Sequence, residues 1–168
     1  MEIWQLAISI AGVIIGFLVG FFAEPVKVYF LNIREKKLLR EGMYKEIAFF
    51  YERMVNISSG DDELGYDWDT YKKTLQVIAR FECYEYAKAN PMLFYQIDES
   101  SVLNKIYATY KTYVEGYIFD NVEEHARNAK GIITIVESII KNQELNKSLF
   151  INSIDREGRL IVQQRLKE

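Results

Sequence analysis

Cysteine and histidine are almost missing from this chain, since Cys83 and His125 are the only residues of their types among 168. A single cysteine excludes a framework of internal disulfides, as expected of a reducing compartment. Zinc sites need three or four Cys, His or carboxylate ligands, so we expect no metal centre and no cofactor. We predict that Cys83 is a small buried residue and that His125 faces solvent on an exposed helix turn.

Catalytic motifs are also scarce. The chain has no glycine-rich phosphate loop and no convincing Ser-His-Asp arrangement. The acidic stretch GDDELGYDWD, residues 60–69, lacks the ligand spacing of an EF-hand. We therefore expect that the protein is not an enzyme.

Charged residues are absent from residues 3–23. At about 1.5 Å per residue, a helix over this stretch is roughly 30 Å long, which matches the hydrocarbon core of a bilayer. Trp4 and Tyr29 lie near its two ends, where aromatic rings favour the lipid–water boundary. A cleaved signal peptide needs a basic start and a small-x-small cleavage site, whereas this chain starts MEIWQ and has Phe21 where a small residue is required. We predict an uncleaved transmembrane helix over residues 1–24.

Basic residues follow this span closely, and none precedes it. They are Lys27, Arg34, Lys36, Lys37, Arg40 and Lys45. The positive-inside rule then places the N-terminus outside and the C-terminal body in the cytoplasm. Residues 24–60 carry an excess of basic side chains, which anionic lipid would attract. The overall charge of −3 argues against a general nucleic-acid coat.

Proline occurs only twice and strand-like alternation is nearly absent, which favours an all-α fold. Apolar residues at steps of three and four predict a juxtamembrane stalk helix over residues 25–57, which Pro25 either begins or kinks. The stretch SSGDDELGYD is typical of a loop. For residues 58–168 we expect a small cytosolic helical bundle.

Within residues 58–168 the capping residues locate four helices. The first starts at Asp67 or Asp69 and is stopped by Asn90 and Pro91, with the short apolar piece PMLFYQI after it. The others start near Asp98, Asp120 and Asn146, and the last runs to the C-terminus. Residues 131–140, GIITIVESII, are β-branched enough for a strand, but their helical flanks favour a helix.

Three glycines stand four residues apart in the predicted span. At about 100° per residue, six small or polar positions fall within an arc of roughly 120°. They are Gln5, Ser9, Gly12, Gly16, Gly20 and Glu24. The pattern GxxxGxxxG lets two helix backbones approach closely, and polar groups in a span usually face protein or water. We interpret this glycine face as an interface for self-association, or more specifically as the lining of a pore; the alternative is a chance alignment, because glycine is common in membrane helices.

Tyrosine and lysine are interleaved along the predicted helices, as in the order Lys105, Tyr107, Tyr110, Lys111 and Tyr113. Proteins that bind single-stranded nucleic acids combine aromatic rings and cations in this way. The alternative is that the tyrosines pack the bundle with their hydroxyls at its edge. The arginines of the C-terminal helix can meet phosphates, a neighbouring subunit or only water. The candidate residues for an anionic ligand are Lys72, Lys73, Lys105, Tyr110, Lys111, Arg156 and Arg159.

The layout resembles small membrane effectors of bacterial antiviral defence systems, among them the Hailong-type effector. The resemblance rests on the span IWQLAISIAGVIIGFLVGFFA, the basic stretch NIREKKLLREGMYKEI and a compact helical remainder. It implies a bacterial inner membrane and a cytosolic domain that senses a nucleotide or oligonucleotide. We therefore expect a homo-oligomeric effector, an ion channel in its strongest form, that such a ligand controls. The alternative is a non-conducting membrane-anchored adaptor whose bundle docks a partner protein.

Overall fold

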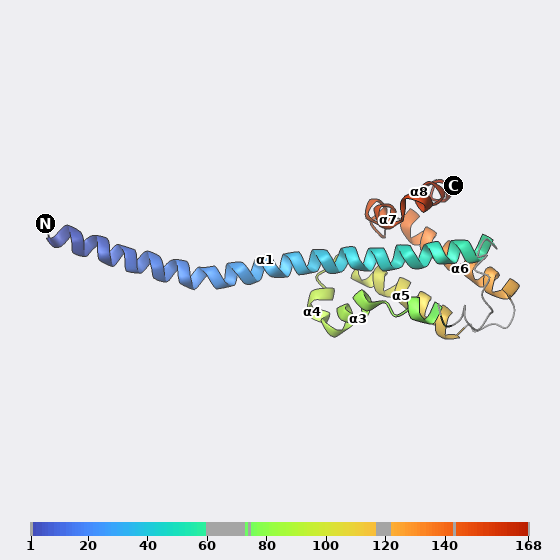
Figure 1. The fold of residues 1–168 in the computed structure, drawn as a ribbon, viewed down its shortest axis with the longest axis horizontal. Helices are drawn as coiled ribbons and strands as arrows, with labels where there is room; N and C mark the ends of the chain where they lie inside the picture. Colours follow the sequence, from blue (N-terminus) through green and yellow to red (C-terminus); the bar gives the residue numbers. More distant parts are fainter. Residues whose placement is uncertain (1, 60–72, 74, 117–121, 143, 168) are drawn as a thin grey trace. The chain divides into compact units, whose positions relative to one another are not determined.

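The computed structural model describes residues 2–59, 73, 75–116, 122–142 and 144–167. The described elements are all α-helices, which confirms the predicted class, and no strand is found among these residues. The helices are α1 (Glu2–Ser59), α3 (Glu82–Ala89), α4 (Pro91–Phe94), α5 (Ser100–Gly116), α6 (Val122–Lys141), α7 (Lys147–Ser153) and α8 (Arg156–Arg165) (Figure 1). The segment 131–140 lies within α6, so the helical prediction for it is confirmed.

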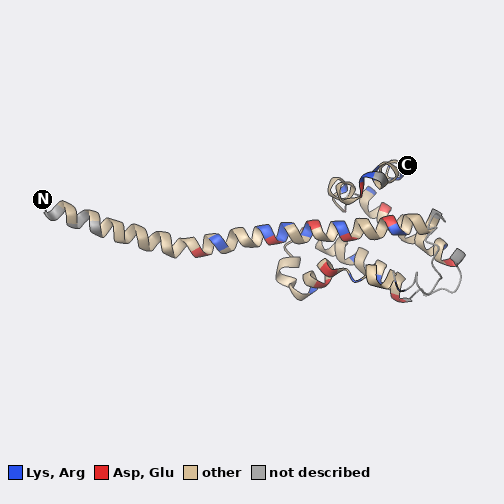
Figure 2. Ribbon diagram, viewed as in Figure 1, with Lys and Arg blue, Asp and Glu red and all other residues tan. Residues whose placement is uncertain are grey.

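The chain divides into two compact units, residues 1–37 and 38–168. The first unit is the N-terminal part of α1, and Pro25 lies inside this helix rather than at its start. After Glu2, α1 carries no charged residue before Glu24, and Figure 2 shows a long uncoloured stretch there. The predicted span and the beginning of the predicted stalk therefore form one helix.

The second unit begins at Leu38, inside the stretch predicted to be a stalk. Five apolar residues on one face of this part of α1 are buried in a single hydrophobic core: Leu39, Met43, Ile47, Phe50 and Met54. Figure 1 shows α3, α4 and α5 on one side of α1 and α7 and α8 on the other. The second half of the predicted stalk is thus the central helix of the packed unit, because its apolar face is covered by the later helices.

The helix predicted to reach Ala89 is interrupted at Phe81. This residue has a left-handed backbone, with φ of 49°, and α3 begins directly after it. Left-handed backbone is unfavourable for a residue with a side chain, but the Phe81 ring is buried and packs edge-on against Phe50, with ring centroids 5.3 Å apart, and against Tyr107, at 5.1 Å. Burial of the ring offsets the backbone cost, which sequence periodicity does not register.

The C-terminal segment forms two helices rather than the single helix predicted. The cap at Asn146 is confirmed, because its Oδ1 accepts a hydrogen bond from the backbone N–H of Leu149 at 2.9 Å. Ile154 and Asp155 are extended and separate α7 from α8, and Ile154 is buried. The predicted caps Asp67, Asp69 and Asp120 lie outside the described residues.

Buried tyrosines of α5 attach this helix to α1. The Tyr107 hydroxyl lies 2.9 Å from the carbonyl oxygen of Met43, and the Tyr110 hydroxyl lies 3.3 Å from that of Ile47. Burial raises the pKa of both hydroxyls, so they keep their protons. Tyr107 and Tyr110 therefore pack the helical unit, as the alternative to ligand binding predicted, but their hydroxyls lie inside the core rather than at its edge.

The prediction that His125 faces solvent is wrong. Its side chain is 4% exposed and its ring stacks on Tyr113, whose hydroxyl lies 2.8 Å from Nδ1. Burial lowers the pKa of His125 from 6.5 to about 4. The acidic residues around it in sequence suggested a surface position, but α6 turns this residue toward α5.

Acidification is expected to destabilise the packed unit through His125. The unfolded chain takes up a proton near pH 6.5 and the folded chain only near pH 4. The contribution is therefore full above pH 6.5 and is lost as the pH falls toward 4, at most about 3 kcal/mol. Thermal unfolding followed by circular dichroism between pH 7 and 4.5 should show this loss, and His125→Phe should flatten it. If the stability of the variant fell equally steeply with pH, His125 would not be the group responsible. Glu52, whose pKa is raised, changes stability in the opposite direction as the pH falls, and it does so in both proteins.

Candidate functional site

The glycine face lies on the uncovered N-terminal part of α1. A Cβ atom added to Gly12, Gly16 or Gly20 would meet nothing within 4 Å. Large apolar side chains elsewhere on this segment are also exposed, such as Val13 at 72% and Phe17 at 71%. Gln5 and Glu24 are exposed as well, while the side chain of Ser9 lies outside the described part. The three glycine positions of this face are therefore open to a close approach by another helix.

One helix of the described chain, near the N-terminus, is long and apolar enough to cross a membrane. Its apolar window has no share buried inside the structure. A core helix of a water-soluble domain would bury such a window, because exposed apolar surface is costly in water. The segment therefore has the length and composition of a single span.

The candidate anion-binding residues of α5 have different environments. Lys105 is exposed, but Lys111 pairs with Glu85 and places its Nζ 5.4 Å from the centre of the Tyr84 ring. Tyr110 is completely buried, so no ligand reaches it in this structure. Lys73 is exposed and Lys72 lies outside the described residues. Tyr110 thus belongs to the core rather than to a ligand site.

The candidate arginines of α8 stand apart from this group. Arg156 is exposed, whereas Arg159 donates hydrogen bonds to the carbonyl oxygens of Ile154 at 2.7 Å and Asn152 at 2.9 Å. Arg159 therefore satisfies carbonyl groups at the end of α7, as basic residues near helix C-termini often do. Because α5 and α8 lie on opposite sides of α1 (Figure 1), the described candidates do not form one anion site.

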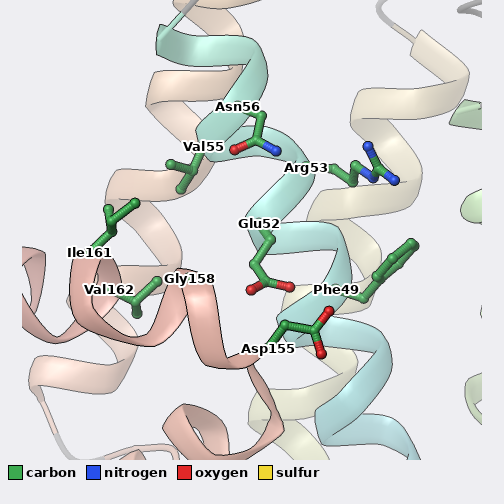
Figure 3. Close-up of a pocket in the computed structure, with 9 residues that line it drawn as sticks. All are labelled: Phe49, Glu52, Arg53, Val55, Asn56, Asp155, Gly158, Ile161 and Val162. Carbon is green, nitrogen blue, oxygen red and sulfur yellow. The ribbon is translucent and has the colours of Figure 1, made fainter. Parts of the chain in front are cut away.

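A groove between α1 and α8 was not predicted from the sequence. It is a cavity of about 360 Å³, which we call the α1–α8 groove (Figure 3). Its lining residues are Phe49, Glu52, Arg53, Val55, Asn56, Asp155, Gly158, Ile161 and Val162. The sequence signal for it is a short apolar run in α8, Leu160 to Val162, of which Leu160 and Ile161 are exposed. This run does not reveal which surface α8 faces.

Polar contacts fix α8 beside α1. Arg165 donates to Oε1 of Glu137 on α6 at 2.8 Å, and the Tyr51 hydroxyl of α1 donates to the same oxygen at 2.6 Å. The Glu52 carboxylate accepts a hydrogen bond from the backbone N–H of Asp155, at the start of α8. A Cβ at Gly158 would collide with the Glu52 carboxylate. A side chain at this position would therefore require the end of the Glu52 side chain to shift.

The environments of the single cysteine and histidine do not suit catalysis. Burial and the nearby Glu46 carboxylate raise the pKa of the Cys83 thiol to about 11, so the thiol stays protonated. Cys83 is partly buried rather than fully buried, and its Sγ would lie 2.7 Å from a Cβ at Gly42. In the described part of the chain, no group of three His, Cys, Asp or Glu residues is placed to hold a metal ion.

Among the residues that the structure describes, two surfaces stand as candidates for function, the glycine face of α1 and the α1–α8 groove. Each is exposed and presents apolar groups. Neither contains the arrangement of nucleophile and base that covalent catalysis requires. No protein-family model, no curated protein and no solved structure matches this chain.

Proposed function

We propose that this chain is a membrane-anchored protein that self-associates through its glycine face and carries the helical unit 38–168 in the cytoplasm. The observation that supports this most directly is the uncovered apolar helix near the N-terminus. Its Ile, Leu, Val and Phe side chains suit lipid, while Gly12, Gly16 and Gly20 present no side chain to it. Close contact with a second helix replaces lost dispersion contacts at such positions. Because the described chain supplies one span, a second copy is the simplest partner.

Control of the assembly by a ligand is the effector form of this proposal, and ion conduction is its strongest version. Gln5, Ser9 and Glu24 on the glycine face supply polar positions to a pore. The role in antiviral defence and the bacterial inner membrane come from the architectural resemblance alone. Tyr110 is buried and the basic candidates on α5 and α8 are dispersed, which argues against a single nucleotide site built from all of these residues.

A non-conducting adaptor is the second candidate function. The α1–α8 groove favours it, because an uncovered cavity with an apolar side is a feature of protein-docking surfaces. In this function the span keeps the helical unit at the membrane and the groove recruits a partner.

Expression of the full chain in bacterial cells tests the anchor and separates the two functions. The protein should remain in the membrane pellet after alkaline carbonate extraction. A C-terminal reporter of a kind that functions only in the cytoplasm should be active. Replacing both Ile14 and Leu18 with lysine should release it, because each central charge costs about 2.5–3.5 kcal/mol on insertion scales. Release of the unmodified protein by carbonate would contradict anchoring.

Membrane potential separates the two functions. A collapse of membrane potential on expression favours the channel, and a normal potential with and without added nucleotides favours the adaptor.

A further inference from the structure

The α1–α8 groove combines an apolar side with a charged end. Phe49 on α1 is 44% exposed and Ile161 on α8 is 55% exposed, while Val162 is buried at the base. A volume of about 360 Å³ lies near the lower limit of ligand pockets, roughly 300–1,000 Å³. The groove therefore has room for a few side chains of another molecule.

The charged end is acidic. Figure 3 shows the carboxylates of Glu52 and Asp155 close together in the groove between α1 and α8. Burial and the nearby charge of Asp155 raise the pKa of Glu52, since repulsion from a second carboxylate disfavours the charged form. A cationic group beside them would relieve this repulsion.

The basic residue that lines the groove, Arg53, offsets the charge of this end only in part, because its charge lowers the pKa of Glu52 by less than burial and Asp155 raise it. The guanidinium of Arg53 lies over the ring of Phe49, 5.4 Å from its centre. Figure 3 shows its side chain directed toward the Phe49 side and away from Asp155. The acidic end therefore stays complementary to an additional cation.

Two helices form the groove, and the described part of the unit offers no sheet edge to which an extended peptide could add. An amphipathic helix laid into a groove is the recognition mode that such a surface supports. We propose that the α1–α8 groove docks a helical segment of a partner protein that presents a lysine or arginine between apolar side chains. The cation meets Glu52 and Asp155, and the apolar residues contact Phe49 and Ile161. This inference supplies the partner chemistry of the adaptor function and does not depend on self-association through the glycine face.

Selection from a displayed library of helical peptides tests this groove. The library, randomised on one helix face, is selected on the full chain in lipid nanodiscs and counter-selected on the Asp155→Lys, Ile161→Ser double variant in the same nanodiscs. Counter-selection removes peptides that bind lipid or other surfaces of the protein. Selected peptides should carry Lys or Arg between apolar residues and should bind the unmodified chain at least tenfold more tightly than either single variant.

Two control variants match the groove variants in chemistry. Leu160→Ser removes a neighbouring exposed apolar residue of α8 that does not line the groove, and Glu144→Lys reverses an exposed charge outside it. Both should bind the peptides as the unmodified chain does. The inference is overturned if no peptide distinguishes the chain from the groove variants, or if acidic peptides are selected. A smaller oligomer in the groove variants alone would also overturn it, because the groove would then be a contact between copies. Gly16→Ile tests self-association separately.

Discussion

Gly16→Ile is expected to weaken the self-association that we propose for the full chain, as measured in detergent. Gly16 is the middle glycine of the face, and a Cβ there meets nothing within 4 Å in a single chain. The larger side chain therefore leaves the isolated helix undisturbed and acts only where another helix approaches. Overpacking a close contact costs about 1–3 kcal/mol, which corresponds to roughly 5- to 150-fold weaker association. Analytical ultracentrifugation at matched detergent concentration measures this shift.

Ala11→Ile is the matched control for this experiment. Ala11 lies on the opposite side of the helix from the glycine face at about 100° per residue, and the substitution has the same small-to-large character. Its oligomer should sediment as that of the unmodified chain. An unchanged oligomer in Gly16→Ile would remove the glycine face from the proposed function, and equal dissociation in Ala11→Ile would mean that the association is not specific to this face.

Glu46→Ala is expected to give the largest loss of stability within the packed unit. The Glu46 carboxylate accepts hydrogen bonds from the backbone N–H of Cys83 at 2.7 Å and of Tyr84 at 3.3 Å. It also lies 2.8 Å from the hydroxyl of Tyr107, which is fully buried. Phe81, the N-cap residue of α3, provides no side-chain hydrogen bond. Glu46 therefore caps α3 from a different helix and connects α1, α3 and α5.

Loss of this acceptor leaves helix N–H groups without a partner, at a cost of about 1–3 kcal/mol for each poorly solvated donor. We expect a destabilisation of about 3 kcal/mol, which lowers the midpoint of thermal unfolding by roughly 6–12 °C in a unit of this size. Circular dichroism of the full chain in detergent measures it.

Two variants control for the capping role of Glu46. Glu46→Gln keeps one acceptor oxygen and should lose less stability than the alanine variant. Lys45→Ala, on the neighbouring exposed position, should change stability by less than about 0.5 kcal/mol. If the midpoint of thermal unfolding of Glu46→Ala equals that of Lys45→Ala, the Glu46 carboxylate does not hold α3 in place.

Local rules predicted the features that depend on nearby residues. The uncharged stretch before Glu24 and the spacing of Gly12, Gly16 and Gly20 are visible in the sequence, because a span and its faces follow from length and helical period. Asn146 is a cap because its side chain reaches an N–H three residues later. The apolar face over Leu39 to Met54 was recognised for the same reason.

Tertiary contacts decided what covers each face. Periodicity identifies the apolar side of a helix but not the helix that packs on it. The sequence therefore did not reveal that residues 38–57 of the predicted stalk lie at the centre of the second unit. The left-handed Phe81 and the buried His125 also depend on rings of α5: the ring of Tyr107, distant in sequence from Phe81, and the ring of Tyr113, 12 residues before His125. No local pattern contains these contacts.

The amino-acid sequence by itself determined the helical class, the candidate span and its glycine face, since all three depend on composition and on the 3.6-residue period. Only the tertiary structure separated the basic candidates on α5 and α8, placed Tyr110 in the core and formed the α1–α8 groove. The physical reason is that a surface site consists of groups from different helices. Their meeting depends on the packing of the whole unit, which the order of residues along one helix does not specify.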